Sequence, residues 1–306
     1  MTSLTSNRPR NAARLLKSVR RDWTGWLFVA PFMIVFALIF IAPVLYSMYL
    51  SVFRDQMVGG NAFVGADNYI RALADDKFWE SLGRVVLFLV VQVPIMIGLA
   101  LVAALAIDSG RLRAAGFFRI GLFLPYAVPG VVAVMMWGFI YGERFGLAGD
   151  VNQLLGSTVL TPLVPEWILV SIGNIITWEF VGYNMLILYA ALRTIPEDLY
   201  EAAKLDGAGQ FRIITGIKLP ALRPALVIAT IFSVIGSFQL FNEPNILRAL
   251  VPNVISTHFT PNMYAFNLSF AGQQYNYAAT IAIIMGVVTA VIAYVVQLRG
   301  TRKEDR

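Results

Sequence analysis

The sequence predicts an all-α integral membrane protein with six transmembrane helices and both termini in the cytoplasm. Three observations support this fold class: the composition, six long apolar segments, and the distribution of basic residues. Of the 306 residues, 58% are hydrophobic and 14% are charged, and the mean hydropathy is +0.68. Soluble domains are usually about 45–50% apolar and about 25% charged. The composition is therefore that of a polytopic membrane protein.

Six segments are long enough to cross the hydrocarbon core of a bilayer, which takes about 20 apolar residues. They are Trp26–Leu50, Val85–Ile107, Ile120–Tyr141, Trp167–Leu192, Pro224–Asn242 and Ala278–Leu298. The fourth segment contains one charged residue, Glu179, and the other five contain no Asp, Glu, Lys or Arg. The first is too long for the core of a signal peptide, about 7–15 residues, so we expect it to be retained. Bends are expected near Gln92 and at Pro94, Pro125 and Pro129, because proline leaves a backbone carbonyl without its helical partner.

The basic residues lie mostly on one side of these spans. Eighteen of the 24 Lys and Arg residues fall in the two tails and in the second and fourth connections. The positive-inside rule places these four segments in the cytoplasm. The expected organisation is a basic tail at 1–25, a six-span domain at 26–298 with a cytoplasmic loop at 193–223, and a second basic tail at 299–306. Charge divided in this way does not predict nucleic-acid binding, which needs basic residues gathered on one face.

The predicted cytoplasmic loop at 193–223 contains signals for the start and the end of a helix. Pro196 suits the first helical position, and the acidic residues after it occupy the first turn, where the helix dipole favours negative charge. Gly207 can end this helix in a left-handed conformation. A second short helix is expected from about Gln210 to Lys218. The loop is therefore predicted to be two short helices joined by a glycine hinge.

Such a loop could lie on lipid headgroups as an amphipathic connector, or it could contact another protein. The run from Leu199 to Gly209 has no broad stripe of bulky apolar residues. Ala202, Ala203 and Ala208 are small enough for a second surface to approach the backbone closely. These features favour a protein partner.

The segment IPEDLYEAAKLDGAGQFRIITGIKLPALRP, residues 195–224, resembles the EAA loop of the permease subunits of ATP-binding-cassette importers. The resemblance is closest to the maltose-type carbohydrate uptake branch. FVGADNYIRALADDKFW (63–79) is similar to the first external loop of that family, and FFRIGLFLPYAVPGVVAVMMW (117–137) to its third span. One departure lies after the fifth span, where FNEPNILRALVPN replaces the T-x-G-G-P segment of the family. We therefore transfer no contacts to the external loop 243–277.

The resemblance implies a type I importer permease fold in which this loop is a coupling helix that docks on a cytoplasmic ATPase subunit. It makes Glu201 the acidic contact and Gly207 the hinge. The residues implied to contact the ATPase are Glu201, Ala202, Ala203, Asp206, Gly207 and Ala208. It further implies a sibling permease in a heterodimer, two ATPase subunits, an extracytoplasmic solute-binding protein and a place in the bacterial plasma membrane.

The chain itself is not expected to be an enzyme or to bind a cofactor. It contains no Gly-Lys dipeptide and so no phosphate-binding loop, which assigns ATP and Mg to the partner ATPase subunits. It has no cysteine and a single histidine, which excludes disulfides, thiolate metal sites and two-histidine metal sites. The spans hold no acid–base pair or nucleophile constellation that would indicate a membrane-embedded enzyme.

Polar and aromatic residues gather in the fourth span and at the end of the fifth. Polar groups in a span usually face a protein interior or a water-filled cavity, although Asn174 and Ser237 could instead bond neighbouring helices. Trp178 and Tyr183 could equally be packing residues. By resemblance, the residues lining the substrate path are Trp178, Val181, Gly182, Met185, Phe238, Gln239 and Asn242. Gln239 and Asn242 are three residues apart and are expected to share one helix face, which makes them the strongest pair.

Glu179 permits two interpretations. It could be a proton relay, as in a proton-coupled secondary carrier, or a structural group that faces the sibling subunit, which we favour. The predicted function is the permease subunit of an ATP-driven importer for a sugar or oligosaccharide. The alternatives are an importer of glycerol phosphate or another small polar solute, and the secondary carrier.

Overall fold

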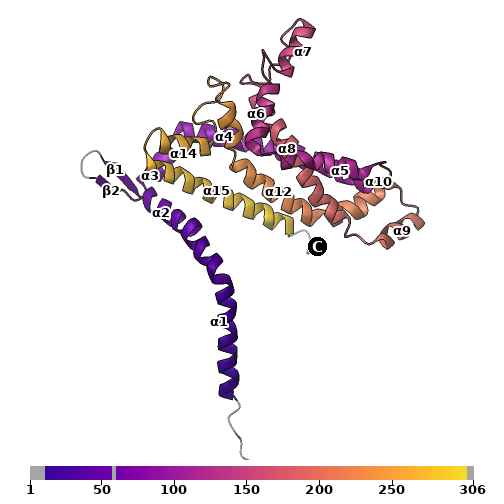
Figure 1. Ribbon diagram of the computed structural model, residues 1–306, viewed down its shortest axis with the longest axis horizontal. Coiled ribbons are helices and arrows are strands. Elements are labelled where there is room, and N and C mark those ends of the chain that lie inside the picture. Colours follow the sequence, from indigo (N-terminus) through magenta and orange to yellow (C-terminus); the bar gives the residue numbers. More distant parts are fainter. Residues whose placement is uncertain (1–10, 57–59, 302–306) are drawn as a thin grey trace, which may run out of the picture.

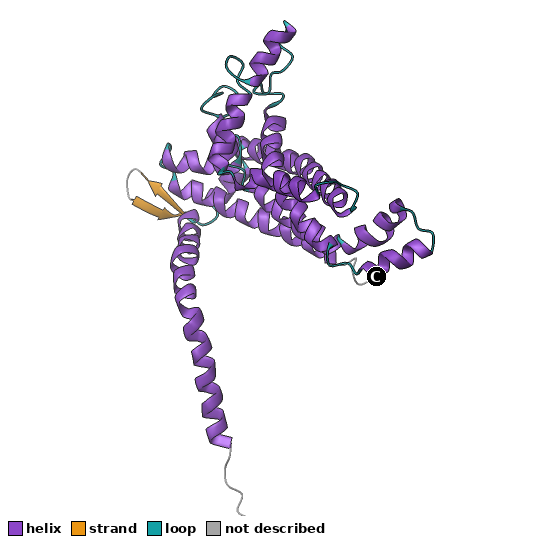
Figure 2. Ribbon diagram, turned by 45° about the vertical axis from the view of Figure 1, so that its right-hand side comes forward, coloured by secondary structure: helices purple, strands orange, loops and turns teal. Residues whose placement is uncertain are grey.

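The computed structural model describes residues 11–56 and 60–301, and most of them lie in helices (Figures 1 and 2). Within these ranges the sheet structure is one antiparallel hairpin of β1 (Phe53–Gln56) and β2 (Gly60–Phe63), which follows the first span. The described parts of the two predicted tails, 11–25 and 299–301, continue the first and last helices. The predicted helical membrane fold is confirmed, with this hairpin added.

Five stretches of the described chain are long and apolar enough to span a membrane. They are α1 (Asn11–Phe36) continued through a π-helical turn (Ala37–Ile41) into α2 (Ala42–Ser51), α4 (Asp76–Asp108), α8 (Ile168–Leu192), α12 (Arg223–Phe238) with α13 (Asn242–Leu247), and α15 (Tyr275–Thr301). They correspond to all the predicted spans except the third.

The third predicted span, Ile120–Tyr141, is a broken helix. It is divided into α5 (Ala115–Phe123), a 3₁₀ turn (Leu124–Ala127) and α6 (Gly130–Ile140), and its two halves meet at 98°. Proline has no backbone N–H, and Pro129 adopts an extended ψ of 129°, so the helix cannot continue through it. The bends expected at Pro125 and Pro129 are confirmed, whereas α4 runs through Pro94 as a single helix.

The fifth predicted span, Pro224–Asn242, is also interrupted. Gln239 caps the end of α12, and Phe241 has φ −147° and ψ −53°, which lies outside the helical region. Asn242 then opens α13. The prediction that Gln239 and Asn242 share one helix face is therefore wrong, because a short non-helical segment separates them.

The core forms where α4 packs along α8 and α12 packs against both α4 and α15. At one end, Ala100 and Ala104 of α4 pack with Met185 and Leu188 of α8, and all four are fully buried. Small residues let two helix backbones approach closely inside a membrane, where hydrophobic burial alone does not drive association. The short helices α3 (Asp67–Leu73) and α14 (Pro261–Phe270) pack against α15 near the hairpin.

Three parts of the chain project from this body: α1, the loop at 193–223, and α6 with the helix that follows it (Figure 1). The first is α1, which extends away while α2 packs on α15, and the apolar window of this span has no buried residue. The second is the loop formed by α9 (Glu197–Leu205), α10 (Gln210–Ile213), a π-helical turn (Ile214–Lys218) and α11 (Leu219–Ala221). This loop lies at the same end of the molecule as the end of α15 and opposite the hairpin (Figure 1). The charge distribution predicts this placement. A further helix, α7 (Leu147–Leu155), lies beyond α6.

Candidate functional site

A cavity of about 370 Å³ lies between α4, α8 and the interruption that follows α12. Its polar lining consists of Gln92, Asn184, Ser233, Ser237, Gln239, Asn242 and Glu243. Its aromatic lining consists of Phe88, Tyr126, Phe180, Tyr183 and Phe232. Of the described residues that line it, none is Lys or Arg. The cavity thus offers amides, hydroxyls and one carboxyl group beside flat aromatic faces, without a cation.

The aromatic part of the lining depends on the break in the third span. Tyr126 lies in the turn between the two halves, and its ring stacks on that of Tyr183 with a centroid distance of 4.8 Å and an interplanar angle of 17°. Phe180 meets Tyr126 edge-on at 5.7 Å. Tyr126 was not predicted as a site residue, although an aromatic residue between two prolines in a span is a signal that could have indicated it.

Gln92 fixes the position of α4 against α8 beside the cavity. Its Nε2 donates to the carbonyl oxygen of Gly173 at 2.8 Å and also to the hydroxyl of Thr177. Gln92 was expected only to mark a bend. Its side chain instead satisfies backbone and side-chain groups of the neighbouring helix, and it reaches the cavity wall.

Asn174 and Ser237, which could have bonded neighbouring helices instead of facing a cavity, make different kinds of hydrogen bond. Asn174 Nδ2 donates to the hydroxyl of Tyr141 at 2.8 Å, so it joins α8 to the residue that follows α6. Ser237 Oγ donates to the carbonyl oxygen of Ser233 at 2.8 Å, within its own helix. Asn174 therefore makes the expected bond between elements, and Ser237 does not.

Two of the seven residues predicted to line the substrate path, Gln239 and Asn242, line this cavity. The other five pack elsewhere in the chain: Trp178, Val181, Gly182, Met185 and Phe238. Met185 is 0% exposed and Phe238 is 2% exposed. Val181 packs against the same core cluster as Met185.

The broken third span explains why the predicted face of α8 is not open. A Cβ placed on Gly182 would lie 1.9 Å from the carbonyl oxygen of Leu122, so the backbones of α8 and α5 meet at this glycine. Trp178 meets Trp137 of α6 edge-on at 5.8 Å. Both halves of the broken span therefore occupy the surface that the resemblance assigned to substrate.

Glu179 is buried in α8 and faces the start of α6. Its Oε1 would lie 3.4 Å from a Cβ built on Gly130, and its Oε2 has no hydrogen-bond partner among the described residues. The amino end of a helix carries partial positive charge, which favours a carboxylate nearby. This position explains how α8 can hold an acidic residue at mid-span.

The first helix of the loop at 193–223 has the predicted structure. Pro196 precedes α9, and Gly207 has a φ of +77°. The N–H of Ala208 donates to the carbonyl oxygen of Ala203, and the N–H of Gly207 donates to that of Lys204. These two bonds form a Schellman motif, which ends a helix with a left-handed residue. The first helix and its glycine cap are confirmed, whereas the second helix contains a π-helical turn and continues past Lys218 to Ala221.

All six residues predicted to contact an ATPase lie at the surface of this loop. Glu201, Ala202, Asp206 and Gly207 are exposed, and Ala203 and Ala208 are half-buried. The structure adds Leu205 and Phe211, whose side chains are 89% and 79% exposed. They were not predicted, because two isolated apolar residues near a turn form no periodic stripe. Both side chains are available to a partner of the loop.

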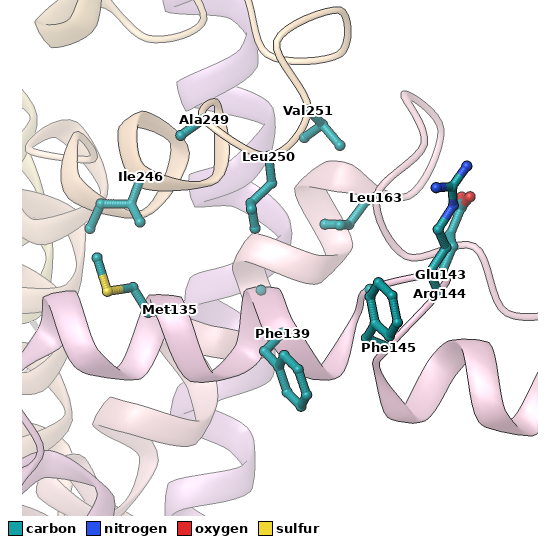
Figure 3. A pocket seen from close by; sticks show the side chains of 12 residues that line it. Met135, Phe139, Glu143, Arg144, Phe145, Leu163, Ile246, Ala249, Leu250 and Val251 are labelled. Atoms are coloured by element: carbon teal, nitrogen blue, oxygen red, sulfur yellow. The ribbon is translucent and has the colours of Figure 1, made fainter.

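A larger cavity, of about 720 Å³, lies elsewhere, between α6 and the segment after α13 (Figure 3). Met135 and Ile246 lie at one end of it, and Glu143, Arg144 and Phe145 lie together at the other (Figure 3). Its lining is otherwise apolar, so it lacks the amides and hydroxyls of the smaller cavity. In the described residues, no group of three or more His, Cys, Asp and Glu side chains could hold a metal ion.

Comparison with known proteins gives one consistent result. Residues 96–302 match the family model described as "Binding-protein-dependent transport system inner membrane component". The chain is 34% identical to the lactose transport system permease protein LacF of Rhizobium radiobacter over 282 residues, which cover 89% of this chain and 92% of LacF. It is 30% identical to the trehalose/maltose transport system permease protein MalF of Thermococcus litoralis over 285 residues, which cover 92% and 95% of the two chains.

A solved structure shares the fold. It is a bacterial alginate ABC transporter in complex with an alginate pentasaccharide-bound periplasmic protein. The TM-score is 0.79 at 22% sequence identity, and the alignment covers 94% of this chain and 98% of the chain in that structure.

Proposed function

The chain belongs to the family of binding-protein-dependent transport system inner membrane components, and we propose that it lines the path by which a sugar or oligosaccharide crosses the membrane. As a permease subunit in the inner membrane it is not an enzyme. The mechanism we propose is alternating access. The spans reorient around the substrate while separate ATPase subunits bind ATP and Mg and hydrolyse the ATP.

The observation that carries the proposal is the cavity at Gln239 and Asn242. Saccharides present hydroxyl groups at their edges and C–H groups on their faces. Amides and hydroxyls at fixed positions can bond the first, and an aromatic ring such as Tyr126 can cover the second. The names of LacF and MalF, which refer to lactose and to trehalose and maltose, support a saccharide substrate.

The charge of the cavity favours a saccharide over glycerol phosphate. A phosphate group is usually held by Arg, Lys or a helix amino end. The described lining contains no Lys or Arg and includes Glu243, whose carboxyl group would face the phosphate. The family membership assigns the chain to binding-protein-dependent transport, which does not need Glu179 as the relay of a secondary carrier.

The projecting loop supports the proposed ATPase contact. Leu205 and Phe211 supply exposed apolar surface, and Glu201 supplies a charge beside it. A partner is further proposed on the opposite side of the membrane, where an extracytoplasmic solute-binding protein would deliver the substrate. The exposed apolar surface of α1 fits lipid together with a sibling permease in a heterodimer.

The test is uptake by the whole importer in proteoliposomes, with the sibling permease, two ATPase subunits and the binding protein present. Calorimetry on the binding protein first identifies the sugar that it binds. We expect uptake of that sugar to require ATP. Uptake of a phosphate ester or another polar solute, with no saccharide transported, would overturn the proposed substrate class.

The ATPase contact is tested by Glu201→Ala, with Asp198→Ala as a matched control that removes the same charge from the same helix. Loss of a charged contact that leaves its partner buried costs about 2–5 kcal/mol. We expect co-purification of the ATPase to fall with Glu201→Ala and to persist with Asp198→Ala. Equal co-purification of the two variants would remove Glu201 from the interface.

A further inference from the structure

The base of the projecting loop contains a buried ion pair between residues that are far apart in the sequence. Lys218 Nζ lies 2.5 Å from Asp108 Oδ2, and the two side chains are 9% and 8% exposed. Asp108 is the last residue of α4, and Lys218 is the last residue of the π-helical turn. The pair therefore joins the end of a membrane-spanning helix directly to the loop at 193–223.

The stability of the fold does not by itself explain why these two charges are buried here. The carboxyl end of a helix carries partial negative charge, so Asp108 opposes the dipole of α4. Two charges removed from water recover their desolvation cost only when the geometry is good, and apolar residues of similar size are often as stable. A buried pair of this kind is best explained by what it fixes in place, here α4 against the turn that carries Lys218.

The same lysine also contacts α9. Lys218 Nζ lies 5.3 Å from the centroid of the Tyr200 ring, within the range of a cation–π contact. No residue of α9 is fully buried. The Tyr200 hydroxyl is shielded from solvent without a hydrogen-bond partner among the described residues, and burial is the main cause that raises the pKa of this tyrosine. Tyr200 is thus a point at which the projecting helix meets the body.

The helix that ends at Asp108, α4, also lines the cavity at Gln239 and Asn242. Phe88, Gln92 and Met96 of α4 line that cavity. Met96 is about 18 Å from Asp108 along the helix, at a rise of about 1.5 Å per residue. Because α4 is continuous between them, a displacement of Asp108 along the helix axis also moves the cavity wall.

We infer that Tyr200, Lys218 and Asp108 form a positioning link that passes movement of α9 to α4. This link joins α9 to α4 in addition to its covalent connections toward α8 and α12. The inference rests on the proposed function of α9 as the ATPase contact. Its two steps are the cation–π contact of Tyr200 on Lys218 and the ion pair of Lys218 with Asp108, so each step can be broken separately.

The experiment measures sugar transported per ATP hydrolysed by the reconstituted importer, together with co-purification of the ATPase. Asp108→Asn and Lys218→Met each break the ion pair. Tyr200→Leu removes the aromatic ring and leaves the pair intact, so it tests the link without an unpaired buried charge. We expect each variant to lower the transport-to-hydrolysis ratio by roughly fivefold or more, the lower range of coupling between sites, while the ATPase still co-purifies.

Three controls separate a link from a merely structural role. Tyr200→Phe retains the ring and should keep the wild-type ratio. Arg113→Gln removes an exposed charge from the same connection as the end of α4, and it should also have no effect. Lys218→Arg keeps a cation that can serve both the Tyr200 ring and Asp108, and it should retain at least half of the wild-type ratio.

Two results would overturn the inference: a wild-type ratio in Tyr200→Leu, or a ratio in Lys218→Arg as low as that in Lys218→Met. Failure of the proposed function would be visible separately, because the wild-type importer would then show no ATP-dependent uptake.

Discussion

Replacing Gly182 by alanine should force α8 and α5 apart. The new Cβ would lie 1.9 Å from the carbonyl oxygen and 2.4 Å from the carbonyl carbon of Leu122, and 2.8 Å from the Cα of Phe123. All three atoms belong to backbone, so a change of side-chain rotamer cannot relieve the overlap. Moving the closest atom from 1.9 Å to 3.0 Å, the shortest separation that real Cβ atoms show, requires a displacement of 1.1 Å between the helices.

The cost follows from this overlap. Overpacking costs about 1–3 kcal/mol, and a rigid backbone neighbour places this site at the upper end. Alanine recovers up to about 1 kcal/mol of helix propensity over glycine. The expected net loss is about 2 kcal/mol, which changes the ratio of folded to unfolded protein by up to about 30-fold. Because α5 leads into the turn that carries Tyr126, sugar uptake should fall as well.

The assay is the thermal stability of the purified chain in detergent, with Gly98→Ala as the control. Gly98 lies on the exposed side of α4, and a Cβ there would have no heavy atom within 4 Å. Gly98→Ala should melt at or slightly above the wild-type temperature, and Gly182→Ala should melt clearly below it. Equal melting temperatures for the two variants would refute the close contact between α8 and α5, and with it the structural role that we assign to Gly182.

Three other predictions concern the loop and the cavity. Gly207→Val should weaken the end of α9 by roughly 1–3 kcal/mol, because a β-branched residue resists the φ of +77°; hydrogen exchange of α9 measures this, and unchanged protection would contradict it. Alanine at both Gln239 and Asn242 should reduce sugar uptake while assembly and basal ATP hydrolysis persist, and normal uptake kinetics would remove the pair from the path. A cysteine at Gln210, in a chain that has no other, should resist an impermeant thiol reagent in intact cells, so labelling from outside would reverse the predicted orientation.

Much of the fold could be predicted from local sequence. The lengths of the apolar segments indicated the spans, because only a continuous helix satisfies its own backbone in lipid. The structure of α9 was equally local, since Pro196 and Gly207 act on their own backbone and need no distant partner. The divided basic residues predicted that the loop at 193–223 and the end of α15 lie on one side, and the structure places them at one end.

The site depended on tertiary structure, because its residues come from separate elements. Pro125 and Pro129 predicted bends, but only the packing of α5 and α6 on α8 decided the angle of 98° that brings Tyr126 to the cavity. The same packing places α5 against Gly182 and α6 against Trp178, two residues that the resemblance had assigned to substrate. Gln239 and Asn242 reach one cavity although the helix between them is interrupted.

The Asp108–Lys218 ion pair likewise depended on tertiary structure. Sequence determined that each residue ends a helical element on the predicted cytoplasmic side. Their separation of 110 positions carries no local pattern, because an ion pair depends on the distance between two side chains and not on their spacing along the chain. The lengths of the spans, the ends of α9 and the side on which the basic residues lie were therefore determined by the sequence. Contacts between distant segments were decided by how the helices pack.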